Sequence, residues 1–232
     1  MPLLAHHAFH TRAKSQPNHI AIELDTEWLT YGQLDTIANT LASELAALGV
    51  ARGDRVAVLM HRCLEVPIAL LAIVRIGAYI VPLEGHIDTN ERVADFLVAS
   101  EPYRHIVAST MDMPVLIVDM HALDGAPATF EPSSDNDDDD DVTYILPHTM
   151  NVVRHAHLMA GAAICGLDRF HTELWPALAR GHVVNLDNKQ TPIAAVRTIA
   201  CVSSPTLEAT IGAAVPPRLF MLPVVDLGDE DA

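Results

Sequence analysis

The sequence predicts an α/β fold in which helices cover both faces of a layered, mainly parallel sheet. Two observations lead to this prediction. Short apolar segments typical of buried strands alternate with segments of helical periodicity. In addition, half of the 232 residues are hydrophobic, which is enough apolar surface for a sizeable core.

The clearest elements lie in the first half of the chain. Apolar residues recur at steps of three and four over 34–48 and Gly49 follows, which predicts a helix with a glycine cap. An almost wholly apolar run over 64–76, followed by Gly77, predicts a second and buried helix. Residues 90–100 are predicted to form a third helix. The short buried runs predicted as strands are 55–59, 105–108 and 115–118.

Residues 131–141 interrupt this pattern with a run of Asp, Ser, Pro, Glu and Asn. Clustered carboxylates repel one another and have nothing to anchor in a core, so this segment is predicted to be an exposed linker. A calcium loop is not predicted, because the carboxylates do not alternate with turn glycines and no distal Glu follows. The predicted organisation is therefore an N-terminal α/β subdomain over 1–130, an acidic linker over 131–141 and a partial second α/β subdomain over 142–232.

The second subdomain has a less regular pattern than the first. A strand is predicted at 142–146 and helices at 151–165 and 170–178. Further along the chain, the predicted elements are strands at 182–185 and 219–222 and a helix near 205–211.

Charge, cysteine content and hydropathy indicate which partners and which compartment to expect. The chain has 30 acidic residues against 14 Lys and Arg, a net charge of −16, so nucleic acid and anionic membranes are not expected partners. Its three cysteines lie far apart, which indicates a reducing compartment. Residues 1–7 lack the features of a signal peptide, and the longest apolar run, 66–74, is too short to span a bilayer. A soluble, cytoplasmic protein is expected.

A few short segments of the sequence resemble parts of known binding or catalytic motifs. Gly161 to Gly166 has the spacing of half a phosphate-binding loop, but Leu167 and Asp168 follow where Lys and Ser or Thr are required. Only Lys14 and Lys189 are available for lysine-dependent chemistry. The signatures G-x-S-x-G and H-E-x-x-H are absent from the sequence, so common hydrolase classes are not indicated.

Histidines are numerous and suggest a metal site at first sight. The grouped ones are His6, His7, His10, His155 and His157. Zinc needs three or four ligands on fixed elements, and the first three lie close to the chain terminus. Incidental histidines are therefore the favoured interpretation, and no metal is predicted.

Asp168 directly precedes the helix predicted at 170–178. Two interpretations follow. The carboxylate caps the N-terminus of that helix, or it receives the ammonium group of a substrate. Spacing alone favours the cap.

Three ordered blocks in the first half of the chain resemble a known family. They are Leu29-Thr-Tyr-Gly-Gln-Leu-Asp35, Leu48-Gly-Val-Ala-Arg-Gly-Asp-Arg-Val-Ala-Val58 and Leu71-Ala-Ile-Val-Arg-Ile-Gly-Ala-Tyr-Ile-Val-Pro-Leu83. They are similar to motifs of the amino-acid adenylation domains of nonribosomal peptide synthetases, which belong to the AMP-forming acyl and amino-acid ligases. Beyond the linker, residues 167–181 resemble the family's F-D-A-x-V-x-E-x-W-P-A-L-x-x-G.

The resemblance implies a fold and a substrate site. The fold is that of the N-terminal large subdomain of adenylate-forming enzymes, in incomplete form. Asp168 falls on the family's aspartate that clasps the substrate α-amino group, and Thr172 on a position that faces the substrate side chain. Arg169 stands where the family has a small residue, so it is expected to obstruct this pocket.

The chain departs from the family at the nucleotide site. Where the family has Y-T-S-G-[ST]-T-G-x-P-K-G, Tyr144 to Leu146 runs directly into Pro147 and His148. The adenine motif, the ribose-binding Asp and the C-terminal catalytic Lys are also missing. The family uses ATP and Mg²⁺, but this chain is expected to bind neither competently, and no catalytic residue is assigned.

Three hypotheses about function follow. The first is a truncated adenylation domain of secondary-metabolite peptide synthesis that cannot form aminoacyl-AMP alone. The second is a non-catalytic interaction or regulatory module, and the third is one half of a split ligase. The expected partners are an amino acid and another synthetase chain or domain, and whether the chain is itself an enzyme stays open.

Overall fold

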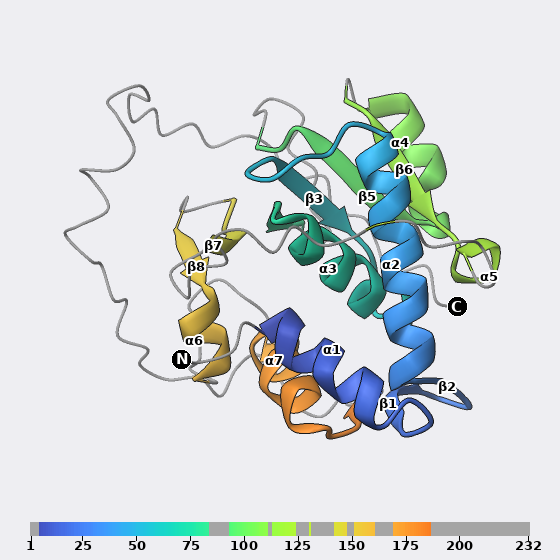
Figure 1. The fold of residues 1–232 in the computed structure, drawn as a ribbon. Helices are drawn as coiled ribbons and strands as arrows, with labels where there is room; N and C mark the ends of the chain where they lie inside the picture. Colours follow the sequence, from blue (N-terminus) through green and yellow to red (C-terminus); the bar gives the residue numbers. More distant parts are fainter. Residues whose placement is uncertain are drawn as a thin grey trace, which may run out of the picture.

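The computed structural model describes residues 5–83, 93–110, 113–123, 130, 142–147, 151–160 and 169–186 (Figure 1). Its helices are α1 (Ala5–Ser15), α2 (Tyr31–Ala47), α3 (Glu65–Ile76), α4 (Arg104–Thr110), α5 (Met120–Leu123), α6 (His155–Met159) and α7 (Arg169–Arg180), with a 3₁₀ turn at Glu101–Tyr103 before α4. Its strands are β1 (Ile20–Leu24), β2 (Glu27–Thr30), β3 (Arg55–Leu59), β4 (Tyr79–Pro82), β5 (Phe96–Ser100), β6 (Val115–Val118), β7 (Val142–Ile145), β8 (Val152–Arg154) and β9 (Val184–Asn185).

The larger sheet has six strands in the order β6-β5-β3-β4-β7-β8. All neighbouring pairs are parallel except β7 and β8, which form an antiparallel pair. Strand β3 lies at the centre, where Val56 is paired with Ile80 of β4 and Phe96 of β5. The predicted α/β fold with a mainly parallel sheet is confirmed. Strand β7, from beyond the acidic segment, joins the same sheet as β4 from before it.

Helices cover both faces of this sheet, as predicted for a layered αβα fold. Successive residues of β3 alternate between two cores, with Val56 and Val58 in one and Ala57 and Leu59 in the other. Helices α2 and α3 contribute to the first core, and Val107 of α4 belongs to the second. Helix α3 is buried almost all round, which explains why its sequence is apolar on every face.

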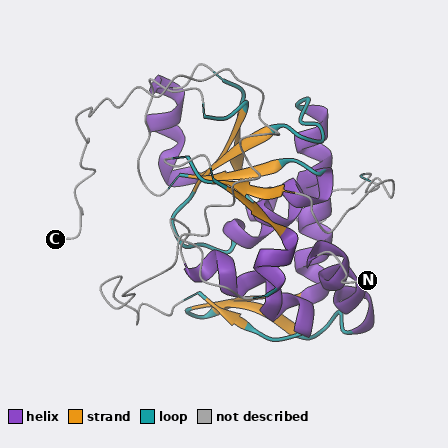
Figure 2. Cartoon of the chain, turned by 90° about the vertical axis from the view of Figure 1, so that its left-hand side faces the viewer, coloured by secondary structure: helices purple, strands orange, loops and turns teal. Residues whose placement is uncertain are grey.

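A second, smaller sheet has the order β2-β1-β9. Strands β1 and β2 form an antiparallel hairpin, and β9 pairs with β1 in parallel, with Ile22 opposite Val184. Helices lie between the two sheets (Figure 2). The pairing of β1 with β9 thus brings together segments from near the start and near the end of the described chain.

The local sequence explains how the main helices begin and end. Helix α2 starts in a capping box, because the Gln33 amide donates to Thr30 Oγ1 at 3.2 Å and the Thr30 amide donates to Gln33 Oε1 at 2.9 Å. Helix α3 ends at Gly77, whose φ of +80° is a conformation that favours glycine. Within the described ranges no helix is long and apolar enough to cross a bilayer.

Most predicted elements of the first half are confirmed, but two are wrong. Residues 96–100, predicted as part of a helix over 90–100, form strand β5, because their apolar run is buried between β3 and β6. Residues 105–108, predicted as a strand, lie in α4. That helix follows the 3₁₀ turn that starts at Glu101-Pro102, where proline presets a helical φ.

In the second half, the strand at 142–146 and the helix at 170–178 are confirmed as β7 and α7. The helix predicted over 151–165 is wrong in its first part, since 152–154 form β8 beside β7 and α6 begins only at His155. Strand β9 covers the end of the strand predicted at 182–185. The elements predicted near 205–211 and at 219–222 lie outside the described residues. Strands β1, β2 and β4 were not among the predicted elements.

Candidate nucleotide and substrate site

The site implied by the resemblance begins at the carboxyl end of β7. This strand runs parallel to β4, with Tyr144 opposite Ile80, so both strands end at the same edge of the sheet. In open α/β sheets, ligands bind outside this edge. The segment that follows β7 therefore lies where a ligand of this sheet would be expected to bind.

The connection from β7 to β8 has six residues, 146–151, and is closed by the Leu146 amide, which donates to the Asn151 carbonyl at 2.9 Å. Its sequence contains neither Gly nor Lys. A phosphate-gripping loop needs glycines so that backbone amides can converge on the anion, and a lysine to balance its charge. The sequence of this connection therefore lacks the residue types that such a loop uses.

The nearest following cation in the sequence, Arg154, does not replace the missing lysine. It ends β8 and lies opposite Val142, at the start of β7. Because β7 and β8 are antiparallel, Arg154 and the six-residue connection lie at opposite ends of this strand pair.

A buried hydrogen-bond network connects β7 to α7. Trp175 Nε1 donates to the Tyr144 hydroxyl oxygen at 3.0 Å, and His171 Nδ1 lies 3.2 Å from the same oxygen. Both Tyr144 and Trp175 are buried, and burial raises the pKa of the Tyr144 phenol above its ordinary value. The neutral phenol can donate its proton to His171 Nδ1 while it accepts from Trp175.

Of the two predicted substrate residues, only Thr172 lies within the described part. It is buried on α7, one turn before Trp175. Asp168 lies outside the described residues, and α7 begins directly after it at Arg169. The assignment of both residues to an amino-acid site stays a prediction.

Three of the grouped histidines lie close together in space. His6 and His155 are both 5% exposed, with ring centroids 5.7 Å apart, and His7 lies 4.3 Å from His6. Burial, followed by the charges of His7 and other nearby cations, lowers the pKa of His6 to about 2. Burial and His7 lower the pKa of His155 to about 4. Among the described residues, no group of three or more His, Cys, Asp or Glu could hold a metal ion.

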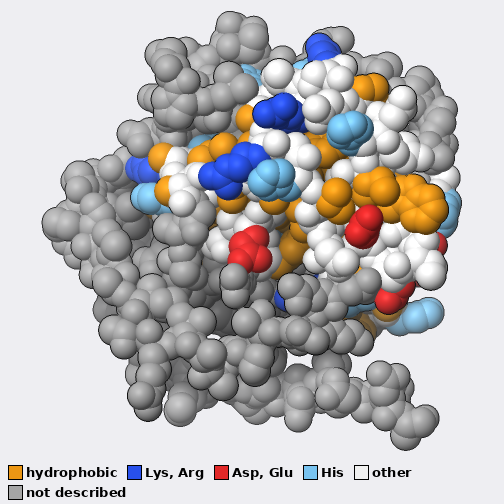
Figure 3. All heavy atoms as spheres, turned by 90° about the horizontal axis from the view of Figure 1, so that it is seen from below, with side chains coloured by type: hydrophobic (Ala, Val, Ile, Leu, Met, Phe, Trp, Pro, Cys, Tyr) orange, Lys and Arg blue, Asp and Glu red, His pale blue; other side chains and the backbone are white. Residues whose placement is uncertain are grey.

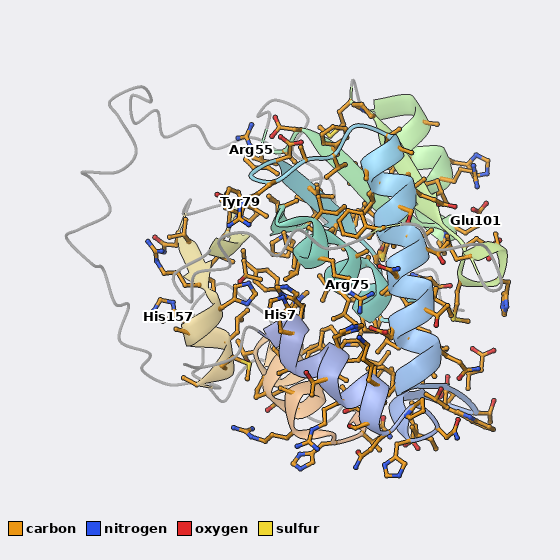
Figure 4. The ribbon with its side chains drawn as sticks, in the orientation of Figure 1. His7, Arg55, Arg75, Tyr79, Glu101 and His157 are labelled. Carbon is orange, nitrogen blue, oxygen red and sulfur yellow. The ribbon has the colours of Figure 1, made fainter. Side chains whose placement is uncertain are left out.

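Sequence reasoning missed a buried ion pair beside these histidines. The Arg75 side chain, 4% exposed, forms an ion pair with Asp35 Oδ1 and donates to the Asp35 carbonyl at 2.9 Å. His10 Nδ1 lies 3.1 Å from the same carboxylate, and the Arg75 guanidinium lies 6.0 Å from the Phe9 ring centre. This pair joins α1, α2 and α3 (Figure 4). The available signal was Arg75 itself, the one charged residue that follows Glu65 in the apolar sequence of α3, because a buried charge requires a partner.

A cleft of about 460 Å³ lies in another part of the molecule, and Thr172 does not line it. Its lining residues come from the β1–β2 turn, the start of α3, α5 and the end of β9: Leu24, Asp25, Glu27, His61, Arg62, Cys63, Leu64, Glu65, Met120, His121 and Leu186. Burial raises the pKa of the Cys63 thiol to about 12, so this cysteine stays protonated and is not an activated nucleophile.

Comparison with known proteins identifies the family. The family model described as AMP-binding enzyme matches residues 9–151, more than half of the chain. The chain belongs to the AMP-binding enzyme family. The predicted resemblance to AMP-forming ligases is therefore confirmed. The match ends at the six-residue connection, so Asp168 and Thr172 lie beyond it.

Two proteins with partly similar sequences illustrate the relatives of this chain. Adenylate-forming reductase 03009 of Coprinopsis cinerea is 38% identical over 122 residues, which cover 53% of this chain and 11% of the reductase. Nonribosomal peptide synthetase astA of Aspergillus oryzae is 32% identical over 127 residues, which cover 51% of this chain and 9% of the synthetase. The chain spans about a tenth of the length of each.

The AMP-binding fold is also found among solved structures. The N-terminal domain of FACL13 from Mycobacterium tuberculosis matches with a TM-score of 0.64 at 20% identity, over 79% of this chain and 57% of that domain. At this identity the match concerns the fold alone, and it agrees with the predicted N-terminal subdomain of adenylate-forming enzymes.

Proposed function

We propose that this chain is part of an adenylation unit of the nonribosomal peptide synthetase type that cannot form aminoacyl-AMP by itself. The observation that carries the proposal is the six-residue β7–β8 connection without Gly or Lys, at the edge of the sheet where the family grips the nucleotide. ATP and Mg²⁺ would have to be held by groups that this segment does not supply.

The physical argument concerns charge that develops during the reaction. In adenylation a substrate carboxylate attacks the α-phosphate of ATP and pyrophosphate leaves, so negative charge on phosphoryl oxygens must be met by fixed donors. Loss of one such donor typically costs about 3–4 kcal/mol of transition-state stabilisation. Here the converging amides and the lysine of the loop are lost together.

We expect the purified chain to show no ATP–pyrophosphate exchange above background with any of the common amino acids. Isothermal titration with ATP and Mg²⁺ is expected to show no binding. An intact relative assayed alongside provides the positive control. Exchange well above background, or tight magnesium-dependent nucleotide binding, would contradict the proposal. Exchange that arises only on mixing with a C-terminal ligase fragment would indicate a split enzyme instead.

The amino-acid site is the second part of this proposal. Asp168 would accept hydrogen bonds from the substrate ammonium, and Thr172 would contact its side chain from the buried face of α7. A charge-assisted hydrogen bond is worth about 1.5–3 kcal/mol, which is about 10- to 100-fold in affinity.

We therefore expect Asp168→Asn to weaken amino-acid binding by about 10-fold or more, measured by ligand-observed NMR on the purified chain. Glu173→Gln is the matched control, since it removes an exposed carboxylate from α7, the helix that follows Asp168 in the sequence, and should leave affinity unchanged. Equal binding by wild type and Asp168→Asn, or no binding by either, would reject the site without affecting the argument about the nucleotide.

A further inference from the structure

The six-stranded sheet has a topological switch point at its centre. The connection from β3 to β4 contains α3, which packs in the first core, and the connection from β5 to β6 contains α4, which contributes Val107 to the second core. Strands β3 and β5 are parallel neighbours, so their connections leave in opposite directions and cover opposite faces of the sheet. In open α/β sheets, a crevice forms outside the carboxyl ends of such a strand pair, and ligands bind there.

The cleft of about 460 Å³ lies at this place in the fold. Two of its lining residues, His61 and Arg62, follow the end of β3, and two others, Met120 and His121, follow the end of β6. His61 Nδ1 lies 3.2 Å from Ser100 Oγ at the end of β5, so a polar contact connects the ends of β3 and β5. The topology of the sheet and the position of the cleft therefore point to the same binding site.

This cleft is separate from the family's nucleotide site. The carboxyl end of β7, where the family grips the nucleotide, is separated from β3 by β4 in the sheet order. Among the described residues, neither Thr172 nor any residue of β7 lines the cleft. A ligand in the cleft would thus be independent of the nucleotide site and of the proposed amino-acid site.

The deeper part of the cleft is apolar. Cys63, Leu64 and Leu186 are buried, and Leu24 and Met120 are half-buried. Small-molecule sites have volumes of roughly 300–1,000 Å³ and hold most of their ligand by apolar contacts, with a few polar groups that orient it. Both the volume and the lining of this cleft agree with that pattern.

Carboxylates outnumber full positive charges among the described lining residues. Asp25 and Glu27 belong to the β1–β2 hairpin and Glu65 to the first turn of α3, whereas Arg62 is the one Lys or Arg in this lining. We call Asp25, Glu27 and Glu65 the carboxylate rim. Figure 3 views the molecule from the side of the small sheet, and acidic side chains lie beside apolar ones on part of the described surface there. The net charge of −16 further favours a cationic ligand.

We propose that this cleft binds a small organic amine, with the apolar body of the amine in the buried part and its ammonium group towards the carboxylate rim. Among the described residues no group of three or more His, Cys, Asp or Glu could hold a metal ion, so the rim suits an organic cation and not a bare metal ion. A ligand of the same shape with a carboxylate in place of the ammonium would face three like charges.

NMR of the ¹³C-labelled methionine methyl groups, in the full chain titrated with tryptamine, tests this proposal. Tryptamine combines one ammonium group with an aromatic body, and 3-indolepropionate has the same ring and spacer with a carboxylate. We expect tryptamine to shift the Met120 methyl signal saturably, with an affinity at least about 10-fold higher than that of the acid. Met159 does not line the cleft and lies on α6, on the other side of the molecule from α5 (Figure 1), so its signal should not change.

A double variant with a matched control tests the carboxylate rim. Asp25→Asn with Glu27→Gln removes two exposed charges at nearly constant shape, and asparagine tolerates the φ of +51° at residue 25. This variant is expected to bind tryptamine about 5-fold more weakly or worse. Glu44→Gln with Glu173→Gln removes two exposed carboxylates that do not line the cleft, so it should bind tryptamine as the wild type does.

Four results would overturn the proposal. The first is no saturable shift of Met120 at millimolar tryptamine, and the second is equal affinity for the amine and the acid. The third is wild-type affinity in the Asp25→Asn, Glu27→Gln variant. The fourth is loss of tryptamine binding in Asp168→Asn, which would place the amine at the proposed amino-acid site. The first two need only the wild-type chain, so they decide the question even if a variant does not fold.

Discussion

Replacement of Asp35 by alanine is expected to destabilise the domain by about 3–5 kcal/mol, because it leaves the buried Arg75 guanidinium without its counter-ion. The Arg75 side chain is 4% exposed, so water cannot substitute for the lost carboxylate without opening the α1–α2–α3 junction. The Asp35 carbonyl, which also accepts from Arg75, remains in the variant but carries no full charge. Urea denaturation followed by circular dichroism measures the change.

Two companion variants separate the ion pair from general packing. Arg75→Met removes the charge and keeps most of the aliphatic side chain, so it should cost less than Asp35→Ala. The double variant should be more stable than the sum of the two single effects predicts, by about 1 kcal/mol or more. Additive effects, or an Asp35→Ala cost below about 1 kcal/mol, would mean that solvent already compensates Arg75.

Trp175→Ala is expected to cost about 3–5 kcal/mol, the range for removal of a fully buried aromatic side chain. Trp175 is 1% exposed, packs in the main core and donates to the Tyr144 hydroxyl at 3.0 Å. The truncation therefore creates a cavity and removes the hydrogen bond that connects α7 to β7. Denaturant unfolding again gives the free energy.

The other tryptophan provides the matched control. Trp28 lies on β2 and is 57% exposed, so Trp28→Ala should change stability by less than about 1 kcal/mol. Trp175→Phe should fall between the two, because the phenyl ring fills most of the space but donates no hydrogen bond. Equal costs for the two alanine variants would mean that α7 does not contribute its core side to the folded domain.

The sequence could predict the fold class because its strongest signals are local. Helix α2 follows from apolar spacing and a capping residue, and α3 from an apolar run closed by Gly77. Strand β5 could not be separated from a helix, since a short apolar run buried on both faces has no period of two. Its neighbours β3 and β6, not its own residues, decide that it is extended.

In the candidate site, too, local sequence motifs could be predicted and contacts between distant residues could not. The lack of a phosphate loop could be recognised in the sequence, because the required glycines and lysine are a local motif. The network of Tyr144, His171 and Trp175 could not, since it depends on how β7 and α7 pack. The contact of His6 with His155 likewise joins residues far apart in the chain, so sequence spacing alone indicated only incidental histidines.

The pairing of β9 with β1 has a consequence for synthesis on the ribosome. Strands β3 to β6 can associate as they emerge, because each finds its neighbour within a short stretch of chain. The β1–β2 hairpin must wait for Val184 before its parallel partner exists, and long-range pairing of this kind folds slowly. In a nascent chain halted before α7, the side of β1 that later pairs with β9 would have unpaired backbone groups. These groups could pair with another extended segment.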